Sequence, residues 1–93
     1  MELNASEYDL LSLINKEVIL PAIPLPMSMA HSLLGEKHSL SLLSCASQTL
    51  LEKELATGWQ AGTSVDGVTG SAVMHYVYDS ITEKGQAILM TKP

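Results

Sequence analysis

Residues 76–89 constrain the fold most, because a strand pattern changes to a helix start within them. Tyr76, Val77 and Tyr78 are of the β-branched and aromatic types that strands favour. Thr82 can then cap a helix whose first turn holds the acidic Glu83. We therefore expect a strand to lead directly into a helix near Thr82, in a domain of the α+β class.

Helical patterns precede this junction. Residues 6–9 (SEYD) have capping-box spacing, so a first helix is expected over about residues 7–19 with Ser6 as its N-cap. Three prolines within residues 21–26 end that helix and predict an extended connector with at most a short edge pairing. A brief second helix is expected from an N-cap at Ser28 to Leu34, with Gly35 as its stop.

A longer third helix is expected over about residues 39–57, ended by Gly58. Leu40, Leu43, Ala46, Leu50 and Leu51 share its apolar face, and Ser41, Cys45, Gln48, Thr49 and Glu52 point away from it. Turn residues then separate two strand-like runs, residues 59–64 and 72–78, which predict a hairpin. Alternation places Ala72, Met74, Tyr76 and Tyr78 on one face of the second strand.

Two segments carry a resemblance to a known superfamily. Residues 78–89 (YDSITEKGQAIL) are similar to the strand-to-helix exit of MarR-type and PadR-type regulators, and residues 50–59 resemble the end of a recognition helix. The resemblance implies a small winged helix-turn-helix domain of the α+β class. Such a domain has three helices, a two-stranded β-hairpin wing and a short C-terminal helix. It also implies duplex DNA as the usual ligand and a homodimer as the usual assembly.

Charge argues against DNA. The five basic residues are all lysines, ten carboxylates oppose them, and the formal net charge is −5. No lysine or arginine occurs within residues 60–80, where the expected wing would meet the phosphate backbone. Arginine, the preferred bidentate reader of guanine, is absent from the whole chain. We expect a protein partner in preference to nucleic acid.

Composition limits the remaining classes of protein. Ninety-three residues fit one domain, residues 1–93, and 46% hydrophobic with 16% charged residues is typical of a globular chain. The longest apolar stretch, residues 18–27, is too short and too rich in proline to cross a membrane. The acidic start is unlike a secretory signal, and the single cysteine allows no internal disulfide. We expect a cytoplasmic protein.

The residues that could carry chemistry are few. His31, His38, His75 and Cys45 match no compact zinc spacing, so no metal and no cofactor is expected. An enzyme that pairs Cys45 with a histidine is the weakest of three functional hypotheses, because no nucleophile signature surrounds Cys45. We expect a protein without catalytic activity.

Two hypotheses are left for the function. The favoured one is a regulatory or adaptor protein that binds another protein, with contacts from Met27, Met29, Leu33 and Asp66; the methionines and leucine can equally be core filling. The alternative is a DNA-binding transcriptional regulator. In that hypothesis the groove would face Ser39, Ser41, Ser44, Gln48 and Lys53.

Overall fold

The computed structural model describes residues 3–18, 24–34, 37–65, 67 and 70–91. These residues form four helices and a three-stranded antiparallel sheet, so the α+β class is confirmed. The elements follow in the order α1 (Ala5–Glu17), β1 (Leu25–Pro26), α2 (Met27–Leu33), α3 (Leu40–Glu52), β2 (Ala56–Val65), β3 (Ala72–Ile81) and α4 (Glu83–Thr91). Within the sheet the strand order is β1-β3-β2.

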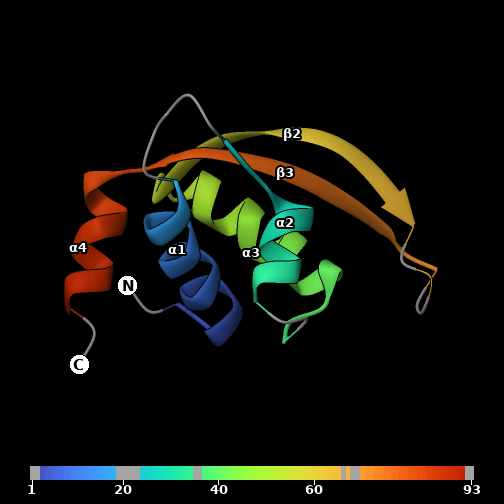
Figure 1. Ribbon diagram of the computed structural model, residues 1–93, viewed down its shortest axis with the longest axis horizontal. Helices are drawn as coiled ribbons and strands as arrows, with labels where there is room; N and C mark the ends of the chain where they lie inside the picture. Colours follow the sequence, from blue (N-terminus) through green and yellow to red (C-terminus); the bar gives the residue numbers. More distant parts are fainter. Residues whose placement is uncertain (1–2, 19–23, 35–36, 66, 68–69, 92–93) are drawn as a thin grey trace.

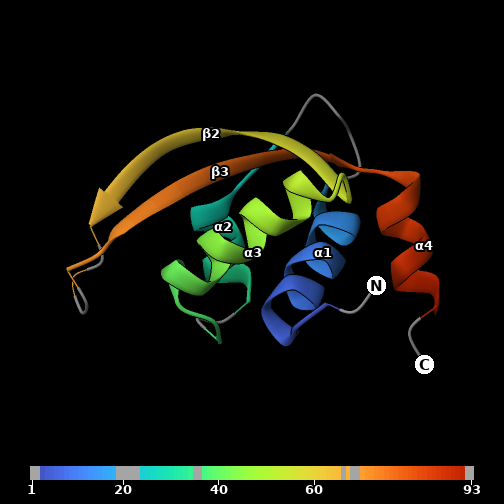
Figure 2. The same cartoon turned by 180° about the vertical axis from the view of Figure 1, so that it is seen from behind.

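The β2–β3 hairpin arches over the helices (Figure 1). α1 and α3 lie beneath it, and α4 lies at the end of the molecule where β3 leaves the sheet. The opposite end of the hairpin projects past α2 and α3, as the reverse view also shows (Figure 2). These far ends of β2 and β3, here called the tip of the hairpin, therefore stand clear of the helices, whereas the base of the hairpin covers them.

The start of α1 differs from the prediction. Asn4, and not Ser6, is the N-cap: its side chain accepts from the Glu7 amide at 2.8 Å, and the Glu7 carboxylate accepts from the Asn4 amide at 3.0 Å. Ser6 lies inside the helix, where it is buried and hydrogen-bonded to His38. The helix ends at Glu17, and the expected end at Ile19 lies outside the described residues.

The second helix also starts earlier than predicted. α2 has Pro26 at its N-cap position without a side-chain hydrogen bond, and Ser28 is an exposed residue within the helix. Its first residue, Met27, is buried. Gly35, the expected stop, lies outside the described residues.

The end of α3 is the largest error in the sequence prediction. Ser39 caps the start through its side chain, but the helix stops at Glu52, five residues before the expected Thr57. Glu54 then takes a positive φ of 58°, a conformation that the sequence does not signal because Glu54 is not a glycine. The turn brings Leu55 into the core and starts β2 at Ala56. The expected apolar face is confirmed: Leu43, Ala46 and Leu50 are buried, with Leu40 and Leu51 packed against them.

The hairpin is longer than predicted, and β1 adds a third strand. Leu25 pairs with Tyr78 and Pro26 with Val77, which is the short edge pairing expected of the proline-rich connector. Tyr76 and Tyr78 are buried as predicted. Towards the tip, however, Val73 is buried while Ala72 and Met74 are exposed, so the predicted face does not continue along the whole strand.

The junction at Thr82 is confirmed. Its hydroxyl accepts from the Gly85 amide at 3.0 Å, which caps α4. The same hydroxyl donates to the Glu54 carbonyl at 2.7 Å, and the Thr82 amide donates to the Leu55 carbonyl at 3.1 Å. The start of α4 is thereby fixed against the turn that precedes β2.

Candidate functional site

The exposed side of α3 is less suited to reading DNA than its sequence predicts. Ser39 uses its hydroxyl as the helix cap, accepting from the Leu42 amide at 3.2 Å. Gln48 is exposed but donates to the Glu52 carboxylate at 3.1 Å. Ser41 and Ser44 are half-buried, and Lys53 is exposed at the C-terminal end of the helix. Of the five candidates, Gln48 and Lys53 are the exposed polar residues beyond the N-cap of this helix.

Two of the residues expected to form the apolar contact surface are exposed. Met29 and Leu33 are 52% and 50% exposed, one helical turn apart on α2. Met27 is fully buried in the core and is unavailable to a partner, which corrects its proposed role. Leu42 on α3 is 52% exposed and was missed, because the sequence does not show which apolar residues escape the core. Asp66 lies outside the described residues.

The hairpin presents apolar side chains where a DNA-binding wing would present cations. Trp59, Val65 and Met74 are 48%, 71% and 45% exposed. Neither strand contains a lysine or arginine, and the sequence has none from Glu54 through Glu83. This surface has no charge with which to attract a phosphate backbone.

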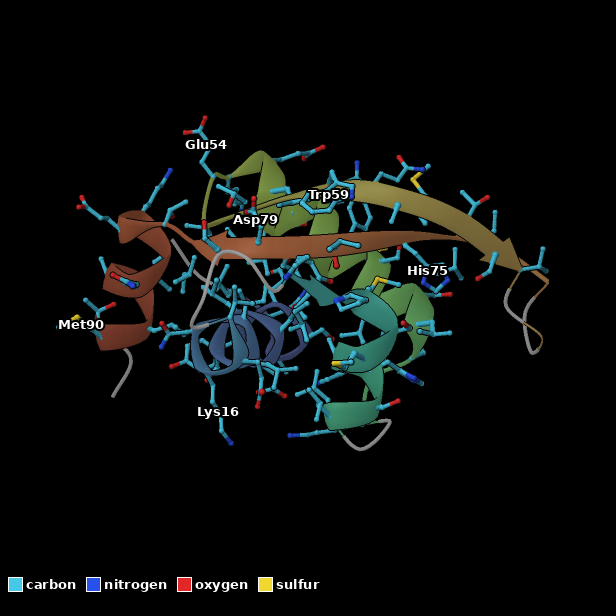
Figure 3. The ribbon with its side chains drawn as sticks, turned by 45° about the horizontal axis from the view of Figure 1, so that its top comes forward. Lys16, Glu54, Trp59, His75, Asp79 and Met90 are labelled. Carbon is cyan, nitrogen blue, oxygen red and sulfur yellow. The ribbon has the colours of Figure 1, made fainter. Side chains whose placement is uncertain are left out.

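Trp59 lies on the face of the sheet that is turned away from the helices. The Tyr78 hydroxyl is hydrogen-bonded to Ser47 of α3, so Tyr78 and its cross-strand partner Gly58 face the helices. Side chains alternate along a strand, which places the neighbouring pair Trp59 and Val77 on the opposite face. Figure 3 shows Trp59 and Asp79 on this outer face, with the Glu54 carboxylate projecting beyond it.

The outer face is also acidic near Trp59. The Asp79 carboxylate accepts a hydrogen bond from the Thr57 hydroxyl, which also lies 2.6 Å from the Ser80 hydroxyl. Next to this network an open hollow of about 730 Å³ separates the base of β2 from α4. Its lining includes Glu54 and Glu83 and a single cation, Lys84. The lining of the hollow therefore holds more carboxylates than cations.

A serine, a histidine and an aspartate meet where α1 contacts the α2–α3 link. The His38 Nδ1 lies 3.1 Å from the Ser6 hydroxyl, and its Nε2 lies 2.7 Å from the Asp9 carboxylate. A carboxylate only accepts, so Nε2 carries a proton and donates it. The Lys37 ammonium is 3.4 Å from the same carboxylate. The hydrogen bond from His38 holds the pKa of Asp9 below its ordinary value of 3.8, helped by Lys37 and opposed by partial burial.

This cluster joins α1 to the segment that precedes α3. Ser6 and His38 are each 8% exposed, so both side chains are largely buried. Cys45 is an exposed residue of α3, and no described contact joins it to a histidine. Among residues 3–18, 24–34, 37–65, 67 and 70–91, no three histidine, cysteine or acidic side chains are grouped so as to hold a metal ion.

The second buried polar contact joins α3 to the sheet. Ser47 donates to the Leu43 carbonyl at 2.6 Å and is also hydrogen-bonded to Tyr78. Burial raises the pKa of the Tyr78 phenol, which keeps it protonated. The contact fixes the base of the hairpin on α3 and leaves the tip without such an attachment among the described polar contacts.

Comparison with known proteins provides no assignment: no protein-family model matches the chain, and no curated protein or solved structure matches it. In the part of the chain that the structure describes, no helix combines the length and apolar character needed to span a bilayer.

Proposed function

We propose that the chain is a non-enzymatic regulatory or adaptor protein with a winged-helix arrangement, and that it binds another protein through its hairpin. The element order and the sheet order β1-β3-β2 are those expected of a winged helix with a C-terminal helix. In this arrangement α3 corresponds to the recognition helix and β2–β3 to the wing. Fold alone does not decide what such a domain binds, so the function rests on the surface.

One observation carries the proposal: the hairpin exposes Trp59, Val65 and Met74 and has no cation. Exposed large apolar side chains on a projecting element are typical of protein contact surfaces, where aromatic residues and methionine are enriched. A formal charge of −5 disfavours approach to a polyanion and favours a partner with basic groups at the contact.

Capture from native lysate with a matched pair of variants tests this function. Met74→Lys places a charge on the hairpin, and Met90→Lys makes the same change at an exposed position of α4. We expect the immobilised wild-type chain and Met90→Lys to retain the same protein partner after nuclease treatment, and Met74→Lys to lose it. Equal capture by the two variants would show that the hairpin is not the contact surface.

The alternative, a DNA-binding regulator, is favoured only by Gln48 and Lys53 on the exposed side of α3. Fluorescence anisotropy with a mixed pool of duplexes at low salt decides it. A DNA-binding protein would show affinity that falls as salt rises and that Lys53→Glu weakens. We expect no saturable binding to any duplex at the lowest salt used.

A further inference from the structure

The outer edge of β2 is an open strand edge without charge. Within the described part of the chain, β2 pairs with β3 on one side only, because the strand order β1-β3-β2 places β2 at the margin of the sheet. All ten of its residues, Ala56–Val65, are uncharged, and none is proline. Natural edge strands are commonly protected by lysine, proline or strand irregularities, since an open edge is a template for pairing with another strand.

Irregularities protect only the base of this edge. The pairing of β2 with β3 shifts register between Thr57 and Gly58 and again between Gln60 and Gly62. From Gly62 to Val65 the register is regular, with consecutive partners from His75 back to Ala72. Residues 62–65 are all exposed. The unprotected part of the edge is therefore the segment nearest the tip.

The position of this segment allows a second copy to approach. The tip of the hairpin projects past α2 and α3 in both views (Figures 1 and 2), so two hairpins can meet edge to edge while their helices stay apart. Among the described residues, β1 covers the opposite edge of the hairpin only at its base, where it pairs with Val77 and Tyr78, and α2 also contacts β3.

Charge limits the surfaces through which two copies can meet. Two chains of formal charge −5 repel each other, and the repulsion is smallest where the facing segments are neutral. The edge of the strand presents backbone N–H donors and backbone C=O acceptors. Two copies related by a two-fold axis can therefore pair these edges antiparallel, each donating to the other. Val65, which is 71% exposed, lies within the paired segment and gains cover from the contact.

We propose that two copies of this chain associate by antiparallel pairing of β2 with β2 at residues 62–65, which joins the two sheets into one. The inference rests on the proposed protein-binding function of the hairpin and names a second copy as one of its partners. The paired segment is short and buries far less than the roughly 1,600 Å² of a standard interface, so the dimer is weak and reversible.

Sedimentation equilibrium over a wide concentration range tests the pairing. The wild-type mass should rise with concentration from 10.0 kDa towards twice that value. Thr63→Lys places like charges at the paired edge and should shift the dimerisation curve at least about tenfold to higher concentration. Thr63→Val keeps the edge neutral and should dimerise at least as well as wild type. Gln86→Lys makes the same charge change at an exposed position of α4, and its dimerisation curve should match that of wild type.

Amide hydrogen exchange provides a second readout on the same samples. Protection of residues 62–65 should increase with concentration in wild type and stay constant in Thr63→Lys. A chain that stays at 10.0 kDa at every concentration, or a dimer equally stable in Thr63→Lys and Gln86→Lys, would overturn the inference. Lysate capture by a dilute, monomeric chain is measured separately, so loss of the dimer leaves the proposed function standing.

Discussion

Replacing Gly85 by alanine tests whether close packing or helix propensity decides the stability of α4. Gly85 lies within α4, where an ordinary glycine-to-alanine change stabilises by about 1 kcal/mol. Gly85 is buried, however, and an added Cβ would overlap the Leu55 carbonyl oxygen and lie 2.9 Å from Cγ1 of Ile81. Real Cβ atoms essentially never come within 3.0 Å of such neighbours, so α4 has to move.

Movement of α4 is costly because its start is attached to the turn before β2. Thr82 donates to the carbonyls of Glu54 and Leu55, and each of these hydrogen bonds contributes about 1 kcal/mol. Loss of both costs about 2 kcal/mol, and a clash with a backbone carbonyl places the overpacking cost in the upper half of about 1–3 kcal/mol if α4 stays in place, so either outcome exceeds the gain in propensity. We expect a net loss of about 1–2 kcal/mol in the free energy of unfolding.

Urea unfolding followed by circular dichroism measures this change, and thermal unfolding should show a drop of roughly 4–8 °C for each kcal/mol. Gln86→Ala is the matched control, because Gln86 is an exposed neighbour in the same helix and its replacement should change stability by only a few tenths of a kcal/mol. The reasoning is refuted if Gly85→Ala stabilises the protein as it would in an exposed helix.

Two further changes test the buried polar contacts. Asp9→Asn should lower the free energy of unfolding by about 1 kcal/mol at neutral pH by weakening the contact with His38. The pKa of Asp9 in the folded protein is depressed below 3.8, so the difference in the free energy of unfolding between wild type and Asp9→Asn should be fully present above pH 4. It should shrink as pH falls through the folded pKa, which urea unfolding at a series of acid pH values measures. Tyr78→Phe should cost about 1 kcal/mol by removing the hydrogen bond to Ser47. The raised pKa of Tyr78 means that the unfolded chain ionises first, so wild-type stability should fall above pH 10 more steeply than that of Tyr78→Phe.

The helix positions were predictable because periodicity and capping residues are local signals. The error at the start of α1 shows the limit of such signals. Asn4 with Glu7 and Ser6 with Asp9 have the same capping spacing, and sequence alone does not rank them. The tertiary contact decides: His38 binds both Ser6 and Asp9, which leaves Asn4 and Glu7 to cap the helix.

The end of α3 was not predictable for a related reason. Leu51 and Leu55 continue the helical spacing of apolar residues, and the only glycine signal comes at Gly58. The chain instead turns at Glu54 in a left-handed conformation, where Leu55 is buried and its amide donates to the Leu50 carbonyl at 2.9 Å. Burial of Leu55 against the core outweighs the local cost of a positive φ at a non-glycine residue.

The candidate surface was predictable in its charge and not in its shape. The missing cations of the hairpin are visible in the sequence, as are Met29 and Leu33 on α2. Which apolar residues stay exposed depends on how the hairpin curves over the helices, and this buries Met27 while leaving Trp59 open. Exposure is a tertiary property, so no local pattern could have singled out Trp59.

Site-specific photo-crosslinking in native lysate tests the role of the hairpin most directly. One variant carries a photoreactive residue at Trp59 on the outer face of the sheet. The other carries it at Lys16, an exposed position of α1 that points away from the hairpin (Figure 3). We expect protein adducts that resist nuclease at position 59 and none at position 16. Nucleic-acid adducts at position 59, or the same protein adducts from both positions, would contradict a protein-binding hairpin.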